Sequence, residues 1–189
     1  MNAGGGLLNV VDVEATCWAG EPPAGQVSEI IEIGLAVADL AGGRRVERHR
    51  ILVRPERSAV SAFCTELTGL TQADADSGVS FEAACRMLER EHAAGSRAWA
   101  SWGDYDRRQF ERQCQAVGVA YPFGAVHVNA KAAFGRARGL RRQPGMAAAL
   151  RIAGLPLEGR HHSGADDAWN IAALILGLHA SGQWPVAAG

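Results

Sequence analysis

The first third of the chain is dominated by apolar runs that predict strands. The run over 7–13 leads into the sequence Asp12-Val13-Glu14, and its length and valine content predict a buried strand. A second apolar run over 29–40 predicts another strand. The pair Gly42-Gly43 marks a turn, and the alternation over 45–53 predicts a third strand that forms a hairpin with the second.

The rest of the chain predicts helices that alternate with short strands. Apolar residues recur at helical spacing over 81–92, directly after Ser80, a residue type that caps helix N-termini. Short strands are predicted over 97–102 and 125–130, and further helices over 104–117, 145–153 and 164–181. This order predicts an α/β domain with a mixed sheet covered by helices, which is compatible with a ribonuclease-H-like fold.

Length and composition indicate an ordinary globular protein. The 189 residues are 48% hydrophobic and 21% charged, and we expect a single domain over 1–189 with its core over about 7–182. No apolar run approaches the roughly 20 residues of a membrane helix, and residues 1–10 lack the basic start of a signal peptide. We therefore expect a cytoplasmic protein that does not bind membranes, with its four widely spaced cysteines reduced.

Charge excludes one class of nucleic-acid-binding protein. The net charge of −1 argues against a protein that coats duplexes through a strongly basic surface. An enzyme that holds one strand end through metals and a few arginines remains compatible with it. The basic segment Lys131, Arg136, Arg138, Arg141 and Arg142 is either a phosphate-contacting strip or a solvated loop, and the second is favoured. The hairpin arginines Arg44, Arg45, Arg48 and Arg50 are expected to serve solubility or edge protection.

Asp12 and Glu14 are the first candidates for chemistry. Strand residues two apart point to the same face, so both carboxylates converge at the end of an apolar strand. Two like charges so close are costly unless a cation lies between them. The spacing alone favours neither this interpretation nor a solvated strand end.

A second candidate is Asp167, near the start of the last predicted helix. On a helical wheel, Asp167 lies about 60° from the centre of the apolar stripe and Asp166 about 160° from it. Asp167 therefore borders the buried face. Ser163 and Asp166 have the spacing of a capping box, so Asp166 is expected to serve the helix end.

The same test separates Asp106 from Asp104. Asp106 shares a helix face with Phe110, Cys114 and Val117, whereas Asp104 points away and is expected to be an N-cap. Taken alone, a capping aspartate before an amphipathic helix is the commoner explanation of this sequence.

His162 precedes Asp167 by five residues and is the candidate general base, because the histidine pKa is close to neutral pH. His161 is its neighbour, and at most one of the two is expected to point into the site. Together the acids and the histidine have the parts that phosphodiester hydrolysis with two metals about 3.5–4 Å apart requires. Oxygen ligands favour Mg²⁺ or Mn²⁺.

Four stretches carry these residues: Val11–Trp18, Cys64–Thr71, Asp104–Phe110 and Gly159–Ala172. In combination they resemble the DEDDh exonucleases, in particular the histone-mRNA and small-RNA-trimming 3′ exonucleases and their bacterial relatives linked to sporulation kinase inhibition. The resemblance implies a five-stranded mixed sheet of the ribonuclease-H type. It also implies a 3′→5′ exonuclease that releases nucleoside 5′-monophosphates from the 3′ end of a single-stranded nucleic acid, with RNA favoured over DNA.

The resemblance also implies residue roles. Asp12, Glu14 and Asp167 would bind the first of two Mg²⁺ or Mn²⁺ ions, Asp12 would bridge to the second, and Asp106 would assist through water. His162, in the spacing His-x-x-x-x-Asp, would be the general base, with the register between His161 and His162 left open. The residues that would contact the terminal nucleotide are Ala15, Thr16, Cys17, Trp18, Leu67 and Thr68. The alternative function is a non-catalytic regulatory or nucleic-acid-binding module on the same fold, and the sequence identifies no protein partner.

Overall fold

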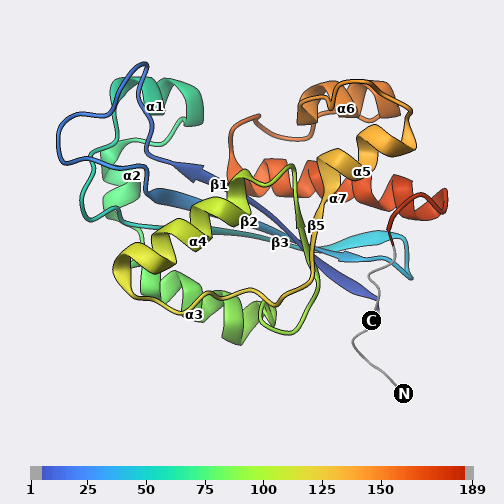
Figure 1. Ribbon diagram of the computed structural model, residues 1–189, viewed down its shortest axis with the longest axis horizontal. Coiled ribbons are helices and arrows are strands. Elements are labelled where there is room, and N and C mark those ends of the chain that lie inside the picture. Colours follow the sequence, from blue (N-terminus) through green and yellow to red (C-terminus); the bar gives the residue numbers. More distant parts are fainter. Residues whose placement is uncertain (1–5, 186–189) are drawn as a thin grey trace.

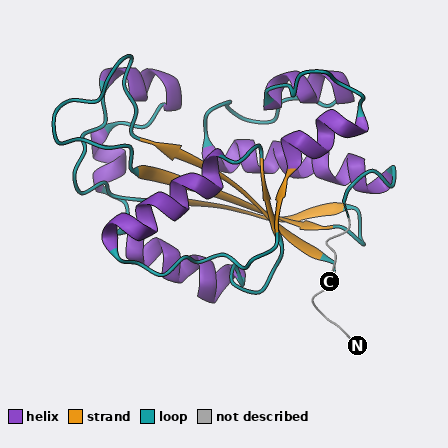
Figure 2. Ribbon diagram, in the orientation of Figure 1, coloured by secondary structure: helices purple, strands orange, loops and turns teal. Residues whose placement is uncertain are grey.

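The computed structural model describes residues 6–185, which are built around one five-stranded mixed sheet (Figures 1 and 2). The strands are β1 (Leu7–Ala15), β2 (Ile30–Asp39), β3 (Arg44–Leu52), β4 (Trp99–Ser101) and β5 (His127–Asn129). Their order in the sheet is β3-β2-β1-β4-β5. The first three strands pair antiparallel, whereas β4 pairs parallel with β1 and with β5. The predicted five-stranded mixed sheet is confirmed.

Helices cover both faces of the sheet (Figure 1). One face is covered by α3 (Phe81–His92) and α4 (Tyr105–Val117), and the other by α5 (Ala130–Ala137), α6 (Met146–Ala153) and α7 (Gly164–Ala180). The short helices α1 (Ala62–Thr68) and α2 (Gln72–Asp76) pack beside the ends of β1 and β2. Within residues 6–185, no helix is long and apolar enough to cross a membrane.

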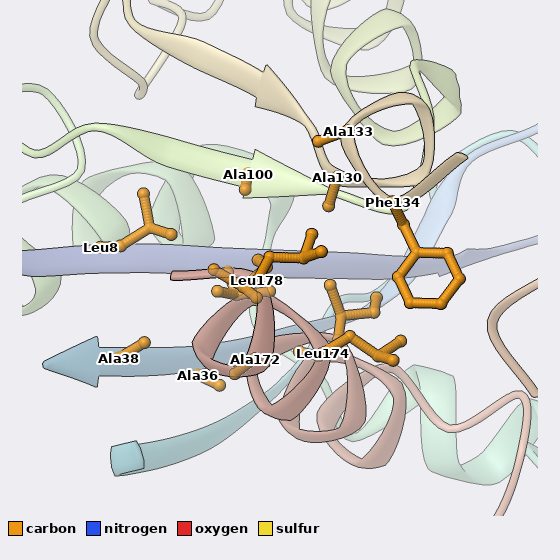
Figure 3. Packing of buried hydrophobic residues seen from close by; sticks show 14 of the residues in the cluster. Leu8, Ala36, Ala38, Ala100, Ala130, Ala133, Phe134, Ala172, Leu174 and Leu178 are labelled. Atoms are coloured by element: carbon orange, nitrogen blue, oxygen red, sulfur yellow. The ribbon is translucent and has the colours of Figure 1, made fainter. Parts of the chain in front are cut away.

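The sheet surface under α7 is built from small side chains. Ala36 and Ala38 lie beside Ala172 of the helix, Ala100 lies beside Ala130 of α5, and larger residues such as Leu174 fill the remaining space (Figure 3). Small side chains let a helix approach a sheet closely, and glycine allows the closest approach of all. A Cβ added to Gly34 would lie 1.9 Å from the carbonyl carbon of Gly164. The start of α7 therefore lies against the middle of β2, next to the β1 residue Asp12 that pairs with Gly34.

One predicted helix is confirmed in detail, whereas other elements differ from the prediction. Helix α3 begins after Ser80 as predicted, and the Ser80 hydroxyl accepts a hydrogen bond from the Ala83 N–H at 3.2 Å. Helices α1, α2 and α5 were not predicted, and α5 includes Lys131 and Arg136 of the basic segment. Val117, predicted to lie on the buried face of α4, is 44% exposed because the helix ends there, beyond the core.

Candidate active site

Four acidic side chains meet in one cleft of about 400 Å³. Asp12 and Glu14 come from the end of β1, Asp106 from the first turn of α4 and Asp167 from the first turn of α7. Carboxylate oxygens of Asp12, Glu14 and Asp167 lie within 4.8 Å of one another. Asp106 borders this group, and its Oδ1 accepts a hydrogen bond from the Val13 N–H at 2.9 Å.

The sheet topology explains why residues so distant in sequence meet. The parallel pairing of β4 with β1 places the start of α4 beside the carboxyl end of β1. The close contact between Gly34 and Gly164 places the start of α7 on the other side of Asp12. In the absence of these two contacts, Asp106 and Asp167 would not share a cleft with the β1 acids.

The carboxylates are electrostatically unfavourable to one another. Burial, reinforced by repulsion from the neighbouring acids, raises the pKa of Asp12 well above its ordinary value and that of Glu14 to about 8. Burial also raises the pKa of Asp106 to about 6 and raises the pKa of Asp167 above its ordinary value. Such a group of oxygens fits a hard divalent cation, which would neutralise the charge that the fold has gathered.

Both histidines of the pair line the cleft. Nδ1 of His161 lies 2.9 Å from Oδ2 and 3.2 Å from Oδ1 of Asp167, while the His162 backbone N–H donates to Asp167 Oδ2 at 3.0 Å. The backbone of His162 has a φ of 64°, in the left-handed region that non-glycine residues rarely adopt. This turn stacks the two rings at a centroid distance of 4.0 Å. The expectation that only one of the two rings would point into the site is therefore wrong.

The predicted capping box at the start of α7 is absent. Ser163 occupies the N-cap position but makes no side-chain capping bond. Instead Glu32, a β2 residue that is 1% exposed, accepts a hydrogen bond from the Ala165 N–H at 3.2 Å. The other carboxylate oxygen of Glu32 accepts from Arg50 Nε at 2.9 Å. Glu32 is thus a fifth acid, not predicted from the sequence, that raises the pKa values of Asp12 and Glu14.

Two of the four hairpin arginines, Arg45 and Arg48, hold α7 and the loop before it, which corrects for these two the expectation of a role in solubility or edge protection. Arg48 pairs with Asp166, whose Oδ2 also accepts from the Arg160 N–H at 2.7 Å. Arg45 pairs with Glu158 at 2.7 Å and lies over the Trp169 ring. A β-bulge between the β2 residues Val37 and Ala38 shifts the register, which is why Arg45 faces the same side as Arg48.

Asp104 occupies the N-cap position of α4 as predicted, but its side chain makes no capping hydrogen bond. Its Oδ2 accepts from Asn129 Nδ2 at 3.0 Å, which links the start of α4 to the end of β5. Asp104 therefore positions the helix that carries Asp106.

The predicted nucleotide-contacting residues occupy different environments. Ala15, Cys17 and Leu67 line the cleft, whereas Trp18 is not among the lining residues. Thr16 and Thr68 are buried, and their hydroxyls donate to the carbonyls of Val27 and Cys64. The lining residues that were not predicted from the sequence are Val13, Trp102, Tyr105, Gly145 and Met146. Trp102 and Tyr105 lie close to Asp104 and Asp106 in the sequence, and this proximity was the signal that could have identified them as lining residues.

Comparison with known proteins identifies relatives over most of the chain. The family model RNase_T, described as exonuclease, matches residues 10–175. The 3′-5′ exonuclease Snipper of Drosophila melanogaster is 31% identical over 187 residues, covering 87% of this chain and 66% of Snipper. The human 3′-5′ exoribonuclease 1 is 29% identical, covering 88% of this chain and 50% of the human protein. The chain therefore spans two thirds or less of the length of these relatives.

Solved structures share the fold closely. The nuclease domain of 3′hExo, a DEDDh family member bound to rAMP, matches with a TM-score of 0.87 and 26% identity, covering 100% of this chain and 99% of that one. A 3′-exonuclease structure that concerns 3′-end recognition of a histone mRNA stem-loop matches with a TM-score of 0.86 and 27% identity, covering 97% and 85%.

Proposed function

Because this chain belongs to the RNase_T exonuclease family and its predicted DEDDh assignment is confirmed, we propose that it is a metal-dependent 3′→5′ exonuclease acting on single-stranded nucleic acid. The products are nucleoside 5′-monophosphates. The observation that carries the proposal is the convergence of four acids and two histidines in one cleft. The relatives named as exoribonucleases, and the neighbours solved with rAMP or concerning a histone mRNA, favour RNA over DNA.

Two Mg²⁺ or Mn²⁺ ions fit the acidic cluster. Asp12, Glu14 and Asp167 would hold the first ion, Asp12 would reach the second, and Asp106 would contribute through water. When bound, such ions neutralise charge on the phosphate and activate water for attack. All candidate ligand atoms are carboxylate oxygens, the donor type that these hard cations prefer.

The two histidines have separate roles in this proposal. His161 donates to the Asp167 carboxylate and fixes its orientation, as partners of metal ligands commonly do. The ring of His162 makes no hydrogen bond to residues 6–185, so it is the imidazole available to take a proton from water. Leu67 and Met146 provide apolar walls on which the terminal nucleoside would rest.

The direct test is digestion of a 5′-labelled single-stranded RNA in Mg²⁺ or Mn²⁺, with a matched DNA oligomer beside it. We expect a ladder of shortened products and release of nucleoside 5′-monophosphates. Asp12→Asn should lower the rate at least about 100-fold, whereas Asp76→Asn, an exposed acid on α2, should not. An intact oligomer under conditions where a control exonuclease works, or release of 3′-monophosphates, would refute the proposal.

A further inference from the structure

A second group of metal-ligand side chains lies on the face of the sheet opposite the catalytic acids. Glu47 and His49 are two residues apart on β3, so both point to the same side. Their partners on β2, Val37 and Leu35, belong to the core beneath α3 and α4. His92, the last residue of α3, completes the group.

The three side chains are close enough to share one ion. One nitrogen of each histidine and one oxygen of Glu47 lie within 4.8 Å of one another. Glu47 Oε2 is 2.9 Å from His49 Nε2, and the His49 and His92 rings are 4.2 Å apart at their centroids, tilted by 49°. The carboxylate oxygens of Asp12, Glu14 and Asp167 in the catalytic cleft lie within the same 4.8 Å limit.

His92 provides an independent indication that a ligand is needed. It is only 5% exposed, yet its Nδ1 is buried with no hydrogen-bond partner among residues 6–185. Buried polar atoms without partners are rare and costly. Its backbone is held firmly, because the His92 carbonyl accepts a hydrogen bond from Asn9 Nδ2 at 2.9 Å.

We propose that Glu47, His49 and His92 form a zinc-type metal site that clamps the edge strand β3 to the end of α3. Two imidazoles and one carboxylate are a common three-residue zinc ligand set that leaves a fourth position for water. Nitrogen donors select transition metals over magnesium, so this site and the all-oxygen catalytic cluster would prefer different ions. The side chains of Glu47 and His49 are 46% and 36% exposed, which gives an ion access from solvent.

The test measures zinc binding in tag-free protein whose catalytic cluster has been disabled by Asp12→Asn and Asp167→Asn. Equilibrium dialysis at micromolar free Zn²⁺, followed by elemental analysis, should find one zinc ion per chain. The same stoichiometry should fall to near zero on adding His92→Ala or His49→Ala. His179→Ala, at an exposed position on α7, is the matched control and should leave it unchanged.

A second measurement covers the case in which the His92 variant fails to fold. Glu47→Gln and His49→Ala alter partly exposed side chains, and each should weaken Zn²⁺ binding at least about 10-fold. Co²⁺ bound at the site should show the visible absorption of a four-coordinate ion, and His49→Ala should remove it. Absence of zinc from the disabled protein, or a zinc content that His49→Ala does not lower, would overturn the proposal.

Discussion

Glu14→Gln should make the metal-free protein more stable while it removes activity. The substitution keeps the size of a side chain that is 8% exposed but removes its charge from the acidic cluster. Burial, together with repulsion from Asp167, Glu32 and Asp106, raises the Glu14 pKa from 4.5 to about 8. In the unfolded chain this repulsion is absent. The folded protein therefore holds a proton on Glu14 that the unfolded chain has already lost.

The sign and size of the effect follow from this difference in pKa. A raised carboxyl pKa gives stability that is present below about pH 4.5 and is lost as the pH rises through about 8. At about 1.4 kcal/mol for each pKa unit, the difference between the folded and unfolded pKa values of Glu14 corresponds to roughly 5 kcal/mol in the free energy of unfolding. The neighbouring acids share the repulsion and relax when one charge is removed. We therefore expect Glu14→Gln to raise the free energy of unfolding by about 2–3 kcal/mol at pH 8 and by little at pH 4.5.

Urea denaturation in the presence of EDTA, at several values of pH between 4.5 and 8.5, measures this gain. Glu82→Gln is the control, since Glu82 is an exposed acid on α3 that pairs with Arg86. It should show no comparable pH dependence. Excess Mn²⁺ should then stabilise the unmodified protein by about 2.7 kcal/mol at 100 times its Kd and the Glu14→Gln variant much less. A gain that is equal at pH 4.5 and pH 8, or a loss at pH 8, would refute the argument.

Three further predictions test the roles of the paired histidines, of Gly164 and of Glu32. His162→Ala should lower kcat about 10²–10⁴-fold, and added imidazole should restore part of the activity. His161→Ala should mainly weaken metal affinity. If imidazole rescued only His161→Ala, the roles of the two histidines would be reversed. Gly164→Ala places a Cβ 2.9 Å from the Asp12 carbonyl oxygen and should lower the free energy of unfolding in urea by about 1–3 kcal/mol. Gly177→Ala is the control on the same helix: its Cβ would have nothing within 4 Å, so it should not destabilise the protein. Glu32→Gln should weaken Mn²⁺ binding in calorimetry but retain activity at saturating metal, and unchanged affinity would exclude an electrostatic role for this acid.

The long elements of the fold could be predicted from sequence, and the short ones could not. Helix α3 has three turns of apolar periodicity after a capping serine, which is enough to define its bounds. Helices α1 and α2 have seven and five residues, too few for a periodic pattern to emerge. Helix α5 was hidden because its basic residues indicated a loop, while Ala133 and Phe134 pack into the core.

The site was predictable where one element decides the direction of a side chain. The helical wheel distinguishes Asp167, which is 4% exposed, from Asp166, which faces Arg48. It fails for the two histidines, because they lie in a loop whose left-handed turn at His162 no periodic pattern reveals. Glu32 lies on a strand, where the helical wheel does not apply, and it was also missed. A charged residue within an otherwise apolar strand is nevertheless a signal that the residue has a partner or a function.

Hydrogen-bond partners are distributed unequally among the acids, and this indicates where a cation is needed most; the acids compared are Asp12, Glu14, Glu32, Asp106 and Asp167. Arg50 and the Ala165 N–H satisfy Glu32, the Val13 N–H satisfies Asp106, and His161 satisfies Asp167. Within residues 6–185, the carboxylates of Asp12 and Glu14 accept no hydrogen bond from any neighbour. Buried charge without a partner is the most costly kind. The fold therefore concentrates its uncompensated charge at the end of β1, and this is why neutralising Glu14 should relieve strain in the metal-free protein more than neutralising Glu32.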